Sequence, residues 1–170
     1  IASLVGIVMG PYLANRFGKK KVYLTAVIIS TALNLLRLLD VTSMILIYIS
    51  ALIGGVAGGW MVPVSTSIQA DNTTYVQYKT GKRAEAAIAS LTSFVSKVAQ
   101  GLGGAIPGYV IAAYGFVTGA SVQPESINTG IILCALILPL IFGILGSLIF
   151  GTQYTLDQKA VIEMDAKINR

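Results

Sequence analysis

The sequence predicts an all-α membrane protein with about five transmembrane helices, and three observations lead to this fold class. First, 55% of the 170 residues are hydrophobic and only 11% are charged, whereas a soluble domain carries about 25% charged residues. Second, the apolar residues form long blocks instead of the short periodic stripes of soluble helices. Third, most of the basic residues lie between these blocks, where short connections between spans are expected.

Five apolar segments are the candidate spans, since a crossing helix takes about 20 residues. They are 1–14, 22–39, 44–70, 86–114 and 127–150. The first is short, and the chain opens inside it without a charged leader or an initiating Met. We therefore expect a fragment that starts within a helix. We assign 1–152 to a transmembrane bundle and 153–170 to a polar, helical tail.

Glycine and proline mark the turns and contacts of these segments. Gly18 interrupts the basic run 15–21 and predicts a tight turn there. Pro63 lacks a backbone N–H donor and should bend the long third span. Closely spaced glycines in that span form a doubled small-xxx-small pattern, which lets helix backbones approach each other. These glycines are Gly54, Gly55, Gly58 and Gly59.

The positive charge predicts an orientation in the membrane rather than binding to nucleic acid. The net charge is +5, and ten of the twelve Lys and Arg residues fall into three groups. The groups are 16 with 19–21, then 79 with 82–83, and finally 159, 167 and 170. Cytoplasmic connections carry an excess of Lys and Arg. We therefore expect loops 15–21 and 71–85 and the C-terminus to be cytoplasmic, in a multi-pass protein of the inner or plasma membrane.

The common catalytic and metal-binding patterns are absent from the sequence. It has no His, and Cys134 is its single Cys, which excludes an internal disulfide and a Cys/His metal cluster. It also lacks a phosphate-binding glycine loop, a GxSxG motif and paired carboxylates within the apolar segments. We therefore predict that the protein is not an enzyme and that it uses no metal or cofactor.

The functional interpretation depends on Lys97, which lies inside the apolar segment 86–114. It follows the start of that segment by about ten residues, which at about 1.5 Å per residue places it near the middle of a ~30 Å hydrocarbon core. An ammonium group at that depth costs about 2.5–3.5 kcal/mol on insertion scales. A water-filled cavity is therefore the natural place for Lys97, and the pattern favours a transporter or channel.

Small and polar residues share a helix face with Lys97, because they recur at spacings of three and four residues. The face consists of Ser90, Ser93, Gly101, Gly104 and Gly108, flanked by Thr92, Ser96 and Gln100. Hydroxyl and ammonium groups together suit a carbohydrate, so Thr92, Ser93 and Lys97 are candidate substrate contacts. Trp60 either adds an aromatic face to this site or only packs and anchors its helix at the interface.

The polar block 71–85 has two compatible interpretations. Its cations Lys79, Lys82 and Arg83 either set the orientation alone, or they also gate the cytoplasmic mouth. In the second case they would pair with Asp71, with Glu85 or with a part of the protein outside this sequence.

At this block the sequence resembles a known family. The similar residues are 70–71, Tyr75, 78–85, Ser90, 93–94, Lys97, 103–104 and Gly108. They resemble the loop and penultimate helix of the melibiose-carrier-like glycoside–pentoside–hexuronide:cation symporters, a family of the major facilitator superfamily. The run at Gly10, 14–16 and 18–20 is similar to the basic cytoplasmic loop of that superfamily.

The resemblance implies that the chain forms most of a C-terminal six-helix bundle and takes part in symport of a sugar or glycoside with Na⁺ or H⁺. It also implies that Lys97 faces the central cavity near the cation-binding carboxylates and the sugar, that Thr92 and Ser93 lie close to the sugar, and that Arg83 contributes to cytoplasmic gating. The cation-binding carboxylates would belong to the N-terminal half of the carrier. The expected partners are therefore that half, the sugar, the cation and membrane lipid.

Several positions depart from the family pattern and leave alternatives open. Thr74 and Gln77 stand where many members carry acids, and Asn15 stands where the superfamily loop often has Asp. The coupling ion, the sugar and the role of Trp60 are therefore undetermined. The alternatives are an exporter of drug or lipid-like substrates from the same superfamily and a non-transporting membrane scaffold in which Lys97 is a structural ion-pair member.

Overall fold

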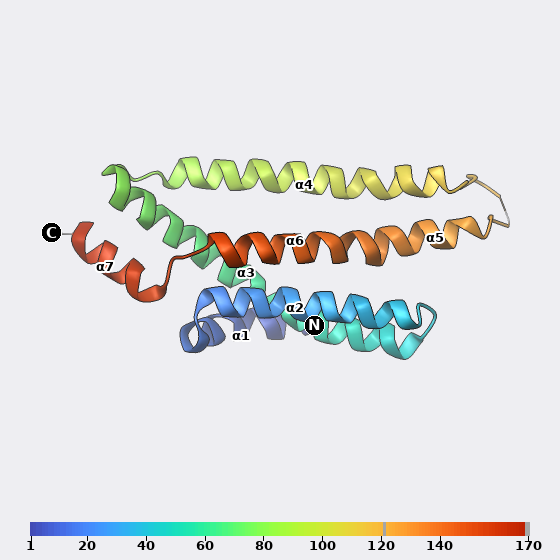
Figure 1. The fold of residues 1–170 in the computed structure, drawn as a ribbon, viewed down its shortest axis with the longest axis horizontal. Helices are drawn as coiled ribbons and strands as arrows, with labels where there is room; N and C mark the ends of the chain where they lie inside the picture. Colours follow the sequence, from blue (N-terminus) through green and yellow to red (C-terminus); the bar gives the residue numbers. More distant parts are fainter. Residues whose placement is uncertain (121, 169–170) are drawn as a thin grey trace.

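The computed structural model describes residues 1–120 and 122–168, and these residues form helices and connecting loops without a β-strand (Figure 1). The helices are α1 (Ala2–Phe17), α2 (Lys19–Leu39), α3 (Met44–Thr80), α4 (Glu85–Ala113), α5 (Ser126–Ile132), α6 (Leu138–Gln153) and α7 (Gln158–Ile168). A π-helical turn, η1 (Leu133–Ile137), joins α5 to α6. The predicted all-α class is confirmed, and α7 lies in the segment expected to be a helical tail.

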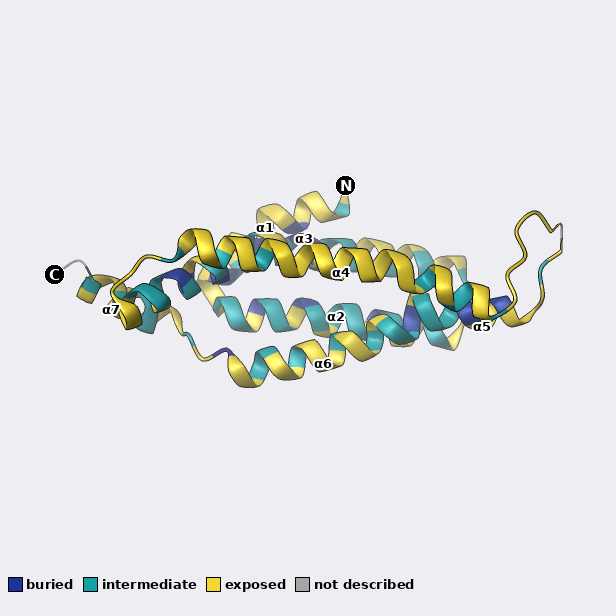
Figure 2. Ribbon diagram, turned by 90° about the horizontal axis from the view of Figure 1, so that it is seen from above, coloured by how far each residue is buried: buried dark blue, intermediate teal, exposed yellow. Residues whose placement is uncertain are grey.

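The long helices run along the longest axis of the molecule (Figure 1). Helices α1, α2 and α3 pack together, and the continuous rod of α5, η1 and α6 lies against α2. Helix α4 lies at the edge, and Figure 2 shows it exposed along nearly its whole length. Helix α7 packs on the C-terminal end of α3. The buried core therefore sits mainly among α1, α2, α3 and the end of α6.

Three helical segments are long and apolar enough to cross a membrane, namely Lys19–Leu39, Met44–Thr80 and Ser126–Gln153. They coincide with three of the five predicted spans. The predicted spans 1–14 and 86–114 correspond to α1 and α4. Over the described residues, neither of these helices is both long enough and apolar enough to count as a candidate span. The π-helical turn lies just before Pro139, where the missing N–H and the bulk of the ring disturb the regular hydrogen-bond ladder of an α-helix.

Helices α1 and α3 pack backbone to backbone because both present glycines at the contact. A Cβ atom at Gly59 would collide with the carbonyl oxygen of Ser3, and one at Gly6 would collide with that of Val56. In contrast, a Cβ at Gly58 would meet nothing within 4 Å. Gly59 therefore makes the close approach predicted for the small-xxx-small pattern, whereas Gly58 faces open space.

The prediction that 71–85 is a loop is wrong for its first ten positions, because α3 continues to Thr80. The polar side chains there do not compete with the helix. The hydroxyls of Thr73 and Thr80 donate to the carbonyls of Gln69 and Val76 one turn earlier. The helix ends at Gly81, whose φ of 70° is left-handed and whose N–H donates to the Gln77 carbonyl.

The predicted turn at Gly18 is confirmed. Its φ of 87° separates α1 from α2, a conformation that costs little for a residue without a Cβ. Lys19 thereby becomes the first residue of α2 and lies at the same end of the molecule as the last turns of α3 (Figure 1).

Candidate functional site

Within this chain, the polar face predicted around Lys97 is open. Lys97 and Ser93 are exposed, and Thr92 is half-buried with its hydroxyl donating to the Ile88 carbonyl at 2.8 Å. No described residue of α4 is buried, and a Cβ at Gly101 or Gly104 would meet nothing within 4 Å. Lys97 has no hydrogen bond or ion pair with the described residues. The part of the chain that the structure describes therefore contributes one surface around Lys97 and no opposing one.

Trp60 lies in a different environment from these α4 residues. It packs against the buried cluster that includes Ala14, Val22 and Val64, in which no α4 residue takes part. Its indole Nε1 is buried and has no hydrogen-bond partner among the described residues. Thr92, Ser93 and Lys97 thus lie on one helix, α4, whereas Trp60 lies on α3 and packs against α1 and α2.

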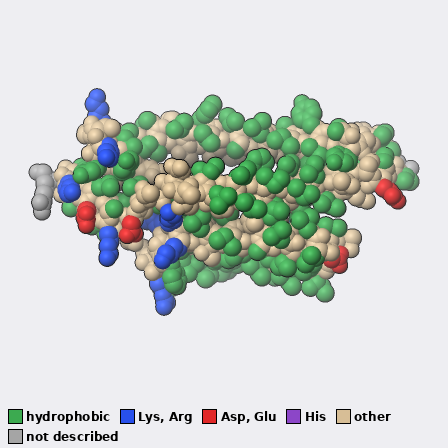
Figure 3. Space-filling model, viewed as in Figure 1, with side chains coloured by type: hydrophobic (Ala, Val, Ile, Leu, Met, Phe, Trp, Pro, Cys, Tyr) green, Lys and Arg blue, Asp and Glu red, His purple; other side chains and the backbone are tan. Residues whose placement is uncertain are grey.

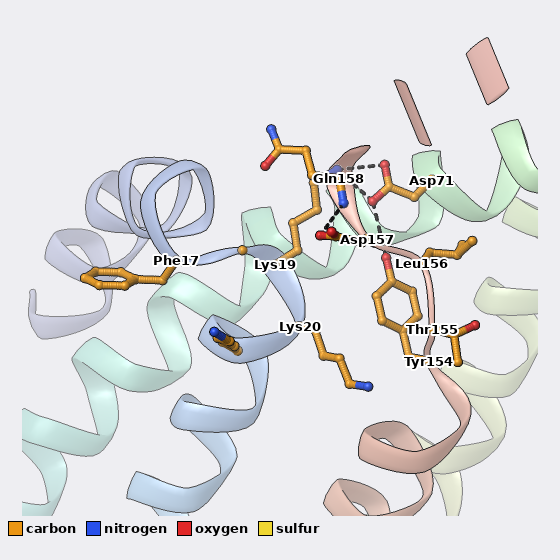
Figure 4. Close-up of a pocket in the computed structure, with 11 residues that line it drawn as sticks. Phe17, Lys19, Lys20, Asp71, Tyr154, Thr155, Leu156, Asp157 and Gln158 are labelled. Atoms are coloured by element: carbon orange, nitrogen blue, oxygen red, sulfur yellow. Dashed lines mark hydrogen bonds and ion pairs between the residues drawn. The ribbon is translucent and has the colours of Figure 1, made fainter. Parts of the chain in front are cut away.

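A buried polar cluster is centred on Asp71 at the basic end of the molecule (Figure 4). The ammonium of Lys19 lies 2.7 Å from each carboxylate oxygen of Asp71, and the Tyr154 hydroxyl donates to Oδ2 at 3.3 Å. Asp71 is only 6% exposed. A buried carboxylate needs such partners to remain in place. The cluster therefore joins the start of α2, the interior of α3 and the segment after α6.

Aromatic packing holds Tyr154 in this cluster. Its ring stacks on Phe150 with a centroid separation of 4.9 Å, and Phe150 contacts Tyr23 at 4.6 Å. Burial, and then the neighbouring Asp71 carboxylate, raise the pKa of the Tyr154 hydroxyl well above its ordinary value. Tyr154 therefore remains a hydrogen-bond donor at physiological pH.

Arg83 forms a separate pair, because its guanidinium lies 2.5 Å from Glu85. Both side chains are more than half exposed, and such a surface pair contributes little to stability. Lys79 lies over the Tyr75 ring at 5.9 Å. Of the partners considered for these cations, the structure thus shows Glu85 for Arg83, whereas Asp71 pairs with Lys19.

Sequence reasoning missed Lys19 and Tyr154 as partners of Asp71. The available signal was the positive-inside pattern, since the 15–21 and 71–85 segments were expected on one side of the membrane. A strongly basic segment facing an acid at the end of a span is a candidate ion pair. Tyr154 carried no comparable signal, because its contact depends on how the chain turns after α6.

The basic end is visible on the molecular surface. Figure 3 shows Lys and Arg side chains gathered at one end of this face, whereas hydrophobic side chains cover most of its length. This distribution agrees with the apolar composition of the spanning segments. The Asp71 cluster and the Arg83–Glu85 pair both lie at this charged end.

Comparison with known proteins gives a consistent result. Residues 1–158 match the family model described as MFS/sugar transport protein. The chain is 30% identical over 173 residues to a glucuronide carrier protein homolog of Escherichia coli (strain K12), covering 97% of the chain and 38% of that protein. It is 32% identical over 169 residues to an uncharacterized symporter of Bacillus subtilis (strain 168), covering 96% and 36%.

A third relative differs in the direction of transport that its name states. The chain is 24% identical over 164 residues to a putative 2,3-dihydroxypropane-1-sulfonate exporter of Salmonella typhimurium, covering 96% of the chain and 35% of that protein. The chain spans about a third of the length of the curated relatives that it matches.

Proposed function

The chain belongs to the MFS/sugar transport protein family, and on that premise we propose that it is the C-terminal part of a secondary active transporter for a sugar or glycoside. Membership confirms the resemblance drawn from the segment around Lys97, and it identifies a membrane protein of a transporter family rather than an enzyme family. The proposed mechanism is alternating access, coupled to Na⁺ or H⁺.

The observation that carries the proposal is the open polar face of α4. Lys97 and Ser93 are exposed, and the neighbouring glycines of this face meet no side chain among the described residues. A cation in a spanning helix is tolerated where it lines a water-filled cavity. In our proposal this face is one wall of the transport pathway, and the N-terminal half of the carrier supplies the other wall.

We assign separate roles to the residues of this wall. Thr92 and Ser93 hydrogen-bond to the sugar hydroxyls, whereas Lys97 contacts both the sugar and the carboxylates that bind the coupling cation. Trp60 enters the site only if α3 moves relative to α1 and α2, because it now packs against their cluster. Trp60 is therefore the weakest member of the proposed substrate site.

The charged end would then act as the cytoplasmic gate. Asp71 holds α2 and the segment after α6 to α3 through Lys19 and Tyr154, and Arg83 pairs with Glu85 at the start of α4. The turn at Gly18 with the flanking helix ends in 15–21, loop 81–84, the last turns of α3 and the C-terminus would all be cytoplasmic. In this arrangement 1–152 is the membrane bundle, 153–170 is the tail, and the membrane is the inner or plasma membrane.

A second candidate is an exporter of the same superfamily, and it is favoured by the relative named as a sulfonate exporter. A cationic Lys97 in a polar pathway suits an anionic cargo as well as a neutral sugar. The two candidates differ in the direction of net transport and in the charge of the substrate.

The deciding experiment measures transport by the complete carrier in vesicles. Labelled neutral sugars, glycosides and sugar acids are offered with and without a Na⁺ or proton gradient, from either side. We expect gradient-driven uptake that Lys97→Ala, Lys97→Gln and Lys97→Met abolish while the protein still inserts. Lys159→Gln is the matched control, because it removes an exposed cation of the tail, outside the pathway. Uptake that survives all three Lys97 variants would contradict the site, and gradient-driven efflux of an anion would favour the exporter.

A further inference from the structure

A second site lies outside the proposed pathway, in a groove on α1, α2 and α3. The groove has a volume of about 400 Å³ and is lined by Met9, Leu13, Phe17, Lys21, Val22, Thr25 and Trp60. Ligand sites typically measure about 300–1,000 Å³. Its described lining is apolar apart from Lys21 and Thr25, and it includes no Asp or Glu. We propose that this groove binds one anionic phospholipid.

The charges at the basic end of the groove favour a negatively charged headgroup. Lys21 is exposed, and its ammonium has no ion pair or hydrogen bond with the described residues. The Arg16 guanidinium lies 5.5 Å from the centre of the Phe17 ring, which is itself part of the lining. The nearby Lys19 is already neutralised by Asp71. Lys21, in the lining, and Arg16, beside Phe17, are therefore available to a phosphate bound at this end of the groove.

The position of the groove matches the depth of a lipid headgroup and its first acyl carbons. Lys21 lies in the first turn of α2, at the start of a helix long and apolar enough to cross a membrane. Basic residues at such a position attract anionic lipid. From Phe17 the apolar lining continues along α1 to Met9, a distance of about 12 Å at about 1.5 Å per residue. An acyl chain bound there would lie along α1 with its phosphate at Lys21.

Trp60 forms part of the groove wall. Its side chain belongs to the lining, whereas its Nε1 is buried and does not open into the groove. A lipid held in the groove would therefore contact the indole ring and not its N–H.

Trp60 also provides the measurement, because it is the single Trp of these 170 residues. The complete carrier is reconstituted into phosphatidylcholine vesicles that contain a fixed fraction of either brominated phosphatidylglycerol or brominated phosphatidylcholine. The Trp60 signal is taken as the difference between the protein and its Trp60→Phe variant. We expect the anionic lipid to quench this signal more strongly than the zwitterionic lipid at equal mole fraction.

Two charge variants decide whether Lys21 is responsible. Lys21→Gln should lower the preference for the anionic lipid by about fivefold, the effect of one cation near an anionic surface. The matched control Lys82→Gln removes an exposed cation that is not part of the groove and should leave the preference unchanged. Equal quenching by the two lipids, or the same preference in Lys21→Gln as in the parent protein, would overturn the proposal. Neither result depends on sugar transport, so the lipid site and the proposed function can fail separately.

Discussion

The ammonium of Lys19 lies 2.7 Å from both carboxylate oxygens of Asp71, although the two residues are 52 positions apart in the chain. The exposed fractions of the two side chains are 19% and 8%. The pair is thus better shielded from water than the Arg83–Glu85 pair, whose fractions are 67% and 59%. Shielded pairs are the ones whose disruption leaves a costly unpaired charge.

The first prediction uses this asymmetry. Lys19→Met should destabilise the protein by about 1–3 kcal/mol, because it leaves the buried Asp71 carboxylate without its cation. Asp71→Asn should cost less, since the amide keeps a hydrogen-bonding oxygen and the abandoned Lys19 is the more exposed partner. Thermal unfolding of the purified protein in detergent measures both effects.

The control for this prediction is Lys20→Met, which removes a neighbouring cation that has no such partner. The double variant Lys19→Met/Asp71→Asn should be more stable than the sum of the single losses implies. If Lys19→Met and Lys20→Met lowered the unfolding temperature equally, the ion pair would have no measurable structural role.

A second prediction concerns the Tyr154 hydroxyl, whose pKa is raised by burial and by the Asp71 carboxylate. An unfolded Tyr ionises near pH 10. Because the folded pKa is higher, the stability due to protonated Tyr154 is fully present below about pH 10 and is lost as the pH rises above that value. Tyr154→Phe should therefore reduce the alkaline loss of stability relative to the parent protein.

Ultraviolet difference absorbance provides the direct measurement. The spectrum of the parent protein minus that of Tyr154→Phe isolates the contribution of Tyr154. This difference should show no tyrosinate signal near pH 10, because the Tyr154 hydroxyl of the folded parent protein is still protonated there. A full tyrosinate signal near pH 10 would mean that Tyr154 is exposed to water.

The helices and the two glycine features were predictable because their causes are local. Long apolar runs, the φ freedom of Gly18 and the small-xxx-small spacing that includes Gly59 all act over a few residues. The extent of α3 was not predictable in this way. The polar composition of segment 71–80 predicts a loop. In the structure the Thr73 and Thr80 hydroxyls instead donate to carbonyls of their own helix, and α3 ends at Gly81.

The partners of Asp71 were not predictable, because they are set by tertiary contacts. Lys19 reaches Asp71 only because Gly18 ends α1 where α2 meets α3, and Tyr154 reaches it only through its stacking on Phe150. The predicted site around Lys97 is local to one helix, so its shared face could be derived from spacing. In the proposed function, the surface opposite that face is supplied by residues outside this chain.

The third prediction tests the close packing of α1 on α3. Gly59→Ala places a methyl group against the Ser3 carbonyl oxygen, and such overpacking costs about 1–3 kcal/mol. Gly58→Ala is its matched control, since a Cβ there meets nothing within 4 Å. It should be neutral or stabilising by up to about 1 kcal/mol, because it replaces Gly in a helix. Equal unfolding temperatures for the two variants would contradict the backbone contact.

The last prediction tests whether the Lys97 face of α4 meets water in the complete carrier. Lys97→Cys and Ser93→Cys are introduced separately after Cys134, the single Cys of this chain, has been replaced by Ser. Both new thiols should react with a hydrophilic, membrane-impermeant thiol reagent, because water in the pathway keeps the thiolate accessible. Val98→Cys is the matched control, since Val98 is also exposed here but points about 100° away from Lys97 around the helix. Labelling of Val98→Cys without labelling of Lys97→Cys would place the water on the wrong side of α4. Protection of both pathway thiols by a transported sugar would connect this face to the cargo, because a ligand held by Ser93 and Lys97 blocks the reagent.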